Sequence, residues 1–384
     1  MKVAVATGTR ADFGLLRPLI QSLKLDTYFE LTLIVTAMHL SKKFGFTRDE
    51  VEASGFSIDF EIPCLEEKDD SFHTSKAVAT ALVGFAKAIE DKRPDLLIIL
   101  GDRTEMLSAA IACTIANVPI AHIHGGETTE GAYDESIRHS ITKMSYLHFT
   151  AAETYRKRVI QLGEHPDNVF NVGAIGIDSI RNLELLNKDE FEKSIDFTLF
   201  KYNILVTYHP VTLEGQSASL QFMNILNALN SLTDTAIIFT HANSDRDGSI
   251  INKMIDTYCD ENKEKTVNIV SLGQLRYLSA LRHVDVVLGN SSSGVLEVPY
   301  FSIPTIDIGD RQKGRLMSES VINCDNNLDA IKSALSKSFD QKFRAKIKSQ
   351  PKIYGNGTAT EHIIDVLKSR KSINLKKSFY DLPK

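Results

Sequence analysis

Histidine and acidic side chains are concentrated in one short stretch of this sequence, directly after an apolar run. The titratable residues are His122, His124, Glu127, Asp134, Glu135, Arg138 and His139. Imidazole and carboxylate groups are the side chains that most often transfer protons in enzymes, and helical residues three or four apart lie on one face. Helix capping accounts for Asp134 alone, but it does not account for the whole group. We therefore predict proton-transfer chemistry here.

A metal site is the competing interpretation of the same stretch. Alternation along a strand points His122 and His124 to one side, with Glu127 close behind. A structural or catalytic zinc site needs three or four ligands at characteristic spacings, and no further ligand follows. We predict no metal.

Loops rich in glycine, serine and arginine indicate a second kind of site, for phosphate. They are Gly8–Gly14 (GTRADFG), Gly101–Arg103 (GDR), Gly289–Gly294 (GNSSSG) and Gly309–Arg315 (GDRQKGR). Glycine permits close backbone approach, and helix N-termini and arginine attract anions. Each loop alone is explained as an ordinary strand-to-helix turn. Together they predict a site for a nucleotide diphosphate, with His209 at the end of a nearby predicted strand.

Short apolar runs alternate with amphipathic stretches along the chain. This pattern predicts the strands and helices that position these loops. Strands are predicted at 2–7, 31–36, 95–100, 119–123, 147–150, 203–208, 236–240, 267–270, 285–288 and 305–308, and helices at 15–24, 74–91, 104–115 and 134–144. This rhythm is typical of parallel sheets covered by helices on both faces. Because ligands of such sheets bind beyond the carboxyl ends of the strands, we expect the active site in the cleft between two such domains.

Composition limits the protein's class. The 384 residues exceed one ordinary core, and a net charge of −5 gives no general attraction to nucleic acid. No apolar run approaches the roughly 20 residues of a membrane span. The four scattered cysteines favour reduced thiols. We predict a cytoplasmic enzyme that binds neither nucleic acid nor membranes.

The motifs, taken in order along nearly the whole chain, resemble those of the hydrolysing UDP-N-acetylglucosamine 2-epimerases. They are TGTRADFG, GDR, HIHGGE, DESIRHSITK, HPVT, GNSSSG and GDRQKGR. The resemblance implies the glycosyltransferase-B type of α/β fold, with two doubly wound Rossmann-like domains. We place these at 1–174 and 175–360, with a final helix and tail, 361–384, crossing back to the first domain.

The resemblance also implies roles for individual residues. UDP would be bound by Arg10, Arg103, Ser291, Ser292, Glu297 and Arg311, and the sugar would be surrounded by Asp12, His39, Asp102, Asp134 and His209. We also count Arg138, Asn290, Ser293 and Gly294 among the substrate-binding residues. We assign acid–base catalysis to Asp102, Glu127, Asp134 and His209, with His124 as a tuning group. His124 departs from the family pattern, because many relatives have Glu there, so the identity of the base stays open.

The predicted reaction converts UDP-N-acetylglucosamine and water to N-acetylmannosamine and UDP, for sialic acid synthesis. It proceeds through anti elimination to a 2-acetamidoglucal and needs no redox cofactor. The partner is thus a UDP-sugar, and we expect a homo-oligomer, a dimer or a tetramer. Three alternatives remain: the same reaction on a UDP-2,4-diacetamido-2,4,6-trideoxy sugar of the legionaminic acid route, a glycosyltransferase, and a non-catalytic sugar-nucleotide sensor.

Overall fold

The computed structural model describes residues 1–68, 70–128, 133–210, 218–242, 248–370, 373 and 375–383. The chain divides into two compact units. The first combines Met1–Arg181 with Ile353–Lys384, and the second is Asn182–Lys352. Each unit is built around its own parallel sheet, which confirms the predicted fold class.

The first unit has a seven-stranded sheet in the order β3-β2-β1-β4-β5-β6-β7. Its strands are β1 (Lys2–Thr7), β2 (Glu30–Thr36), β3 (Phe60–Ile62), β4 (Leu96–Leu100), β5 (Ile120–Ile123), β6 (Leu147–Thr150) and β7 (Val169–Asn171). The predicted strands agree with β1, β2, β4, β5 and β6 to within one residue at each end. The edge strands β3 and β7 are absent from the prediction, because three residues are too few for a recognisable apolar pattern.

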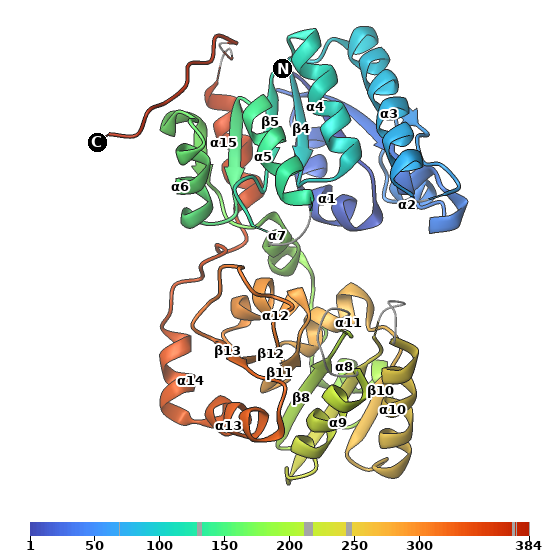
Figure 1. Ribbon diagram of the computed structural model, residues 1–384, viewed down its shortest axis with the longest axis vertical. Coiled ribbons are helices and arrows are strands. Elements are labelled where there is room, and N and C mark those ends of the chain that lie inside the picture. The colour runs from blue at the N-terminus through green and yellow to red at the C-terminus, as the bar shows by residue number, and fades with distance from the viewer. Residues whose placement is uncertain are drawn as a thin grey trace. The chain divides into compact units, whose positions relative to one another are not determined.

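Helices cover both faces of this sheet. They are α1 (Arg10–Leu25), α2 (Arg48–Ala53), α3 (Ser71–Lys92), α4 (Thr104–Ala116), α5 (Asp134–Met144), α6 (Glu153–Gln161), α7 (Ile175–Asn182) and α15 (Ala359–Ser369), with 3-10 turns η1 (Ala37–Leu40), η2 (Lys42–Phe44) and η3 (Pro166–Asn168). α1 and α15 bury leucine and isoleucine side chains on one face, and α3, α4 and α5 cover the other. In Figure 1 the red α15 accordingly lies among the blue and green elements of this unit.

The segment that returns to the first unit is tied to α7. Asp178 accepts hydrogen bonds from the backbone N–H groups of Ala359 (3.0 Å) and Thr360 (2.6 Å) at the start of α15. The Arg181 guanidinium donates to the carbonyl of Gly357 at 3.1 Å. These bonds place both α7 and the residues from Ile353 in the first unit, so its boundaries differ from those expected after residues 174 and 360.

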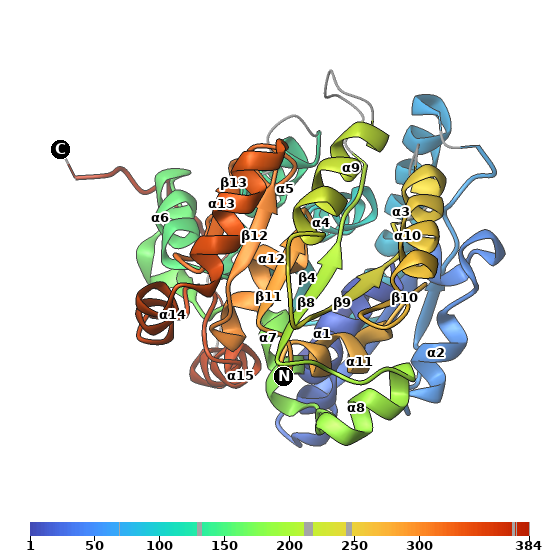
Figure 2. The ribbon, with the colours of Figure 1, turned by 90° about the horizontal axis from the view of Figure 1, so that it is seen from below.

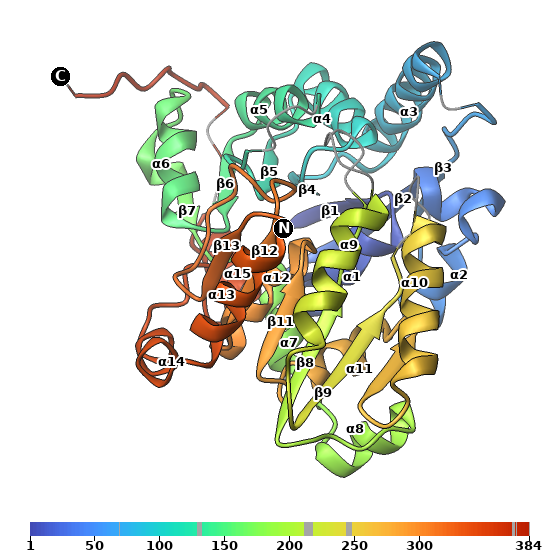
Figure 3. The ribbon, with the colours of Figure 1, turned by 60° about the horizontal axis from the view of Figure 1, so that its bottom comes forward.

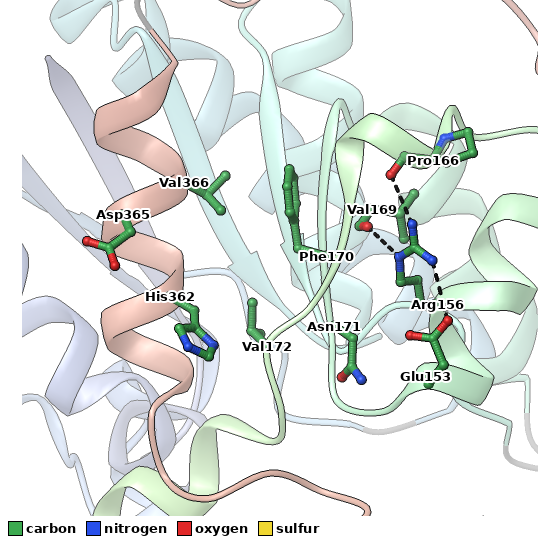
Figure 4. Close-up of a pocket in the computed structure, with 10 residues that line it drawn as sticks. All are labelled: Glu153, Arg156, Pro166, Val169, Phe170, Asn171, Val172, His362, Asp365 and Val366. Carbon is green, nitrogen blue, oxygen red and sulfur yellow. Dashed lines mark hydrogen bonds and ion pairs between the residues drawn. The ribbon is translucent and has the colours of Figure 1, made fainter.

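Strand β7 has an exposed side that one arginine covers. The Arg156 guanidinium donates to the main-chain carbonyls of Val169 (2.8 Å) and Pro166 (3.4 Å), and its Nη1 pairs with Glu153 at 3.3 Å. Figure 4 shows these bonds beside a cavity of about 450 Å³ that reaches α15. Unpaired carbonyls of an edge strand invite pairing with another chain, and the guanidinium occupies the first carbonyl of β7, that of Val169.

The second unit has a six-stranded sheet in the order β10-β9-β8-β11-β12-β13. Its elements are α8 (Lys188–Ile195), β8 (Tyr202–Thr207), α9 (Ala218–Leu229), β9 (Thr235–Thr240), α10 (Gly248–Glu261), β10 (Thr266–Ile269), α11 (Gly273–Ala280), β11 (Val286–Gly289), α12 (Ser292–Leu296), η4 (Val298–Phe301), β12 (Thr305–Ile308), β13 (Val321–Cys324), α13 (Leu328–Phe339) and α14 (Gln341–Lys348). Helices α9, α10 and α13 share one apolar core with the sheet and pack beside one another (Figures 2 and 3).

Within the described ranges, no helix combines the length and the apolar character needed to cross a membrane.

Candidate active site

The predicted site residues lie beyond the carboxyl ends of the strands, at or next to the topological switch point of each sheet. Strand order reverses between β1 and β4 in the first unit and between β8 and β11 in the second. Ligands of open α/β sheets bind beyond the carboxyl ends of strands at such points, where loops diverge. The loops at Gly8, Gly101 and His124 follow β1, β4 and β5, and those at His209 and Asn290 follow β8 and β11.

Asp12 holds the turn after β1. Its carboxylate accepts hydrogen bonds from the hydroxyls of Thr7 (3.1 Å) and Thr9 (2.7 Å) and from the backbone N–H groups of Gly8 (2.9 Å), Thr9 (2.7 Å) and Phe13 (2.9 Å). Together with Thr9 it forms a capping box, so α1 begins at Arg10 rather than near Leu15. These donors explain why Asp12 is buried, whereas its predicted contact with the sugar stays a prediction.

His39 and Arg10 lie in different surroundings near that turn. His39 is fully buried between the hydroxyls of Thr7 (3.1 Å) and Thr47 (2.9 Å), and burial lowers its pKa. Arg10 is exposed and pairs with Glu50 at 2.9 Å. The surroundings of His39 are those of a neutral structural imidazole, whereas the Arg10 guanidinium is accessible to an anion.

The carboxylate of Asp102 is paired with Arg138 of α5. Arg138 is buried, and one of its Nη atoms lies against Asp102 while the other contacts Glu135 (3.1 Å) and the main-chain carbonyl of Glu127 (2.9 Å). The neighbouring Arg103 contacts Glu105, a buried carboxylate that the sequence interpretation missed, at 2.5 Å. Arg138 thus joins the loops after β4 and β5 to the helix that carries Asp134.

Asp134 begins α5 close to these charges. Burial raises its pKa, and the negative charge of Asp102 raises it further, against the opposing effect of Arg138 and Arg103. A carboxyl group whose pKa is raised retains its proton at higher pH and is suited to donate it.

His124 and Glu127 form an ordered pair after β5. The Nδ1 atom of His124 lies 3.0 Å from a carboxylate oxygen of Glu127, and the backbone N–H of Ile175 donates to its Nε2 at 3.3 Å. Because Nε2 accepts a hydrogen bond, the proton of the neutral ring must be on Nδ1, the atom that lies beside the Glu127 carboxylate. His124 therefore has a defined tautomer, and its protonated nitrogen faces a carboxylate.

His122 has a different environment from His124, contrary to the expectation that both rings lie on one side of a strand. β5 ends at Ile123, and His124 takes the left-handed conformation with φ +67°. His122 is buried, with Nε2 at 2.7 Å from the carbonyl of Gly101 and Nδ1 at 3.2 Å from Thr142 of α5. Burial lowers its pKa to about 3, so its ring is neutral and structural.

In the second unit, the side chain of Asn290 fixes the main chain at His209. Its amide oxygen accepts from the His209 backbone N–H at 2.8 Å, and its amide nitrogen donates to the His209 carbonyl at 2.8 Å. Asn290 is buried, and its own carbonyl accepts from Arg311 and Gln312 at 2.9 Å each. The loops after β8, β11 and β12 are thereby joined at one point. The residues Val211 and Thr212 of the HPVT motif lie outside the described residues.

Ser291, Ser292 and Ser293 follow at the beginning of α12, all half-buried, with Gly294 fully buried behind them. The Ser293 hydroxyl donates to Glu297 and lies 2.5 Å from the hydroxyl of Tyr277. Burial raises the pKa of Glu297 against the opposing hydrogen bond of Ser293. The Cβ of any larger residue at Gly294 would meet Thr305 at 2.8 Å, so this glycine is required for packing against β12.

Among the described residues, no group of histidine, cysteine, aspartate and glutamate has the geometry of a metal site. Other polar contacts near the predicted residues escaped the sequence interpretation, because they come from the main chain or from distant segments. The Ile175 N–H that fixes His124 has no signature in the sequence. Thr142, four residues after Arg138, was detectable only as one polar position in the α5 pattern.

Comparison with known proteins gives three close relatives over most of the chain. A "GDP/UDP-N,N'-diacetylbacillosamine 2-epimerase (hydrolyzing)" of Campylobacter jejuni is 42% identical over 88% of this chain and 89% of its own. "Polysialic acid biosynthesis protein P7" of Escherichia coli is 37% identical over 100% and 98%. The "UDP-N,N'-diacetylbacillosamine 2-epimerase (hydrolyzing)" of Legionella pneumophila is 36% identical over 96% of both chains.

Solved structures with the same fold include UDP-GlcNAc 2-epimerase from Neisseria meningitidis bound to UDP-GlcNAc. It has a TM-score of 0.78 and 17% identity, covering 96% of this chain and 100% of that one. A sequence model of the family described as UDP-N-acetylglucosamine 2-epimerase matches residues 21–368. On this match and on the identity to its relatives, the chain belongs to the UDP-N-acetylglucosamine 2-epimerase family.

Proposed function

We propose that the protein is a hydrolysing 2-epimerase, which converts a UDP-activated 2-acetamido sugar and water to the free 2-epimer and UDP. The observation that carries the proposal is the clustering of proton-transfer groups beyond β4 and β5 of the first unit: Asp102, which is paired with Arg138, and Glu127, which lies beside His124. A glycosyltransferase needs fewer such groups, and a sensor needs none. The family membership and the hydrolysing relatives support the same reaction.

The chemistry follows from the substrate's shape. In an α-linked gluco sugar nucleotide, the C2 hydrogen and the UDP group are both axial and antiperiplanar. A base on the face opposite UDP removes the C2 proton while the C1–O bond breaks, leaving a 2-acetamidoglucal and UDP. Water then adds at C1, and C2 receives a proton on the other face, which inverts its configuration. One side chain cannot easily serve both faces.

We assign this acid–base work to Asp102, Glu127, Asp134 and His209. The raised pKa of Asp134 favours it as a proton donor. Glu127, whose carboxylate lies 3.0 Å from Nδ1 of His124, is suited to accept a proton. In this assignment His124 orients a carboxylate, although many members of the family have a carboxylate in its place.

We assign UDP binding to the loops of the second unit, with Ser291, Ser292, Glu297 and Arg311, and to Arg10 and Arg103 of the first. Cationic groups and N–H donors stabilise the charge that develops on a leaving diphosphate. Replacing Arg311 or Ser292 by Ala should weaken UDP binding by about 1–3 kcal/mol, as expected for a hydrogen bond to a charged group. Calorimetry of UDP binding measures this, and unchanged affinity would remove the residue from the site.

For the sugar, we propose the UDP form of N,N'-diacetylbacillosamine, which is the 2,4-diacetamido-2,4,6-trideoxy sugar. The names of the relatives at 42% and 36% identity favour it. UDP-N-acetylglucosamine is the second candidate, supported by a "UDP-N-acetylglucosamine 2-epimerase" of Neisseria meningitidis at 31% identity and by the polysialic acid protein. The product would feed legionaminic or sialic acid synthesis, respectively, in the cytoplasm, where the free cysteines stay reduced.

The deciding experiment incubates the pure protein with each UDP-sugar in deuterated water, with EDTA present and without NAD or an acceptor. We expect stoichiometric UDP and a free manno-configured sugar that carries deuterium at C2, both visible by NMR. The preferred sugar is the one with the larger kcat/KM. A product that keeps its original C2 hydrogen would exclude the elimination route. Activity that requires an added divalent ion would overturn the metal-free mechanism.

A further inference from the structure

Residues 375–380, which follow α15, run along the first unit and are attached to it at several points; we call them the strap. The hydroxyl of Tyr146 donates to the carbonyl of Leu375 at 3.1 Å, and the backbone N–H of Tyr380 donates to the carbonyl of Gly163 at 2.9 Å. The ring of Tyr380 meets His165 edge to face, with centroids 5.2 Å apart. Both ends of the strap are therefore attached to the first unit.

Lys377 in the middle of the strap caps the C-terminal end of α5. Its ammonium donates to the carbonyls of Lys143 (2.8 Å) and Ser145 (2.6 Å) and pairs with the buried carboxylate of Glu164 at 2.6 Å. The last carbonyls of a helix have no partner within the helix and carry partial negative charge. A single ammonium group thus satisfies two of these carbonyls and neutralises a buried acid.

Phe379 of the strap lies over Gly163, although its side chain stays 65% exposed. Gly163 has φ +89°, and a Cβ at this position would collide with the ring of Phe379. The ammonium of Lys143 lies 5.0 Å from the centre of the same ring, and its other contact is Glu164 at 2.6 Å. Glu164 also accepts from the buried His148 at 3.0 Å. Two lysines and one histidine therefore converge on one carboxylate, and one of the lysines belongs to the strap.

The opposite end of α5 carries groups that we assign to the reaction. The helix has 11 residues, with Asp134 at its first position and Arg138 one turn later. Arg138 contacts Asp102, and Thr142 contacts His122 of β5. Because a helix of this length moves nearly as a rigid rod, the position of its last turn determines where Asp134 and Arg138 are presented.

We propose that Lys377 is a positioning residue for catalysis, which holds α5 through its C-terminal carbonyls and thereby aligns Asp134 and Arg138. This inference rests on the proposed function, because it assumes that Asp134 and Arg138 act on the sugar. The residues of the second unit that we assign to UDP binding lie in or directly beside α12 and in the loops after β11 and β12, not in α5 or the strap. Loss of the strap should therefore reduce turnover and spare UDP affinity.

The test compares Lys377→Met, which keeps the length of the side chain without its charge, with Lys342→Met, the same change at an exposed lysine of α14. We expect Lys377→Met to lower kcat by about 10- to 100-fold, the cost typical of a misplaced catalytic group, with the Kd for UDP within twofold of wild type. Lys377→Arg, which can still donate to the carbonyls, should recover much of kcat. Lys342→Met should match wild type.

A second measurement does not depend on the reaction. Amide hydrogen exchange in α5 should be faster in Lys377→Met than in wild type and unchanged in Lys342→Met. If Lys377→Met fails to fold, Phe379→Ala loosens the strap more gently and is judged by the same criteria. A wild-type kcat in a folded variant, unaltered exchange in α5, or an equal loss of kcat and UDP affinity would each overturn the inference. An inactive wild-type enzyme would instead contradict the proposed function, and the exchange measurement would still decide the role of Lys377.

Discussion

The guanidinium of Arg138 is the positive charge that Asp102 and Glu135 share. Its side chain is 5% exposed and serves Asp102, Glu135 and the main chain of Glu127. A lysine could not reproduce this arrangement, because only the planar guanidinium presents several donors in fixed directions. Arg138 is thus both a structural tie and a source of the charge that acts on Asp102 and Asp134.

Replacing Arg138 by Met should destabilise the protein by up to about 3 kcal/mol, since it leaves a partly buried carboxylate without its partner. The loss is reduced because the Asp102 side chain is 25% exposed. Denaturant unfolding measures the effect. The double variant Asp102→Asn/Arg138→Met should regain part of the stability, since no lone charge remains; a double variant as unstable as the sum of the single ones would refute the pairing.

Replacing Glu127 by Gln should lower turnover by about 10²–10⁴-fold, the usual contribution of a general acid or base. UDP affinity should stay near that of wild type, because the assigned UDP-binding residues do not include Glu127. Glu184→Gln, the same change at an exposed glutamate, is the matched control. Rates of UDP release and calorimetry give both quantities. A Glu127→Gln enzyme with wild-type kcat would remove Glu127 from the catalytic group.

At the scale of residues, His122 and His124 show what could and could not be predicted from the sequence. Their spacing correctly singled out a region of dense polar contacts, but alternation placed both rings on one side. The chain leaves the strand after Ile123, and a positive φ at His124 turns its ring towards Glu127 and Ile175. That turn is set by bonds to neighbouring strands, such as the His124 N–H to the carbonyl of Phe149 (2.9 Å), which no local pattern contains.

Among the elements, buried strands with continuous apolar runs could be predicted almost to the residue. Short edge strands could not, because β3, β7 and β13 owe their existence to pairing with a neighbour rather than to their own side chains. The start of α1 was missed because it depends on the reciprocal cap between Thr9 and Asp12. The strap was expected only as a tail crossing back, since its docking depends on contacts with residues 143–165.

The cluster around Glu164 makes the attachment of α5 dependent on pH. Burial alone would raise the pKa of Glu164, but His148, Lys143 and Lys377 outweigh it and lower the pKa to about 2. A carboxyl group whose pKa is depressed on folding adds stability above its unfolded pKa of about 4.3. That stability is lost as the pH falls through the folded value.

We therefore expect Glu164→Gln to be less stable than wild type at neutral pH, with the difference shrinking between pH 4.5 and pH 2, a window bounded by the unfolded and folded pKa values of about 4.3 and 2. Urea unfolding at a series of pH values measures the two curves. Curves that stay parallel down to pH 2 would show that Glu164 is not ionised in the folded protein.

At the scale of the whole molecule, the sequence indicated two α/β units and a return of the chain to the first. It could not place the crossing points, because they depend on Asp178 and Arg181 binding the segment at 357–360. The family followed from motif order along the chain, whereas the substituents of the sugar have no counterpart in the motifs. The names of relatives, rather than residue patterns, carry the proposal for N,N'-diacetylbacillosamine.

The discontinuous first unit has a consequence for how the protein is made. Met1–Arg181 leaves the ribosome first, yet the apolar face of α1 is completed only by Ile363 and Leu367 of α15. At 5–20 residues per second, synthesis of the intervening chain takes roughly 10–40 s. For that time a surface destined for the core faces water, and we expect the nascent chain to recruit a chaperone. Ribosome-bound chains stalled before residue 353 should crosslink to a chaperone that binds exposed apolar surface, whereas chains stalled well beyond residue 384, on an added linker, should not.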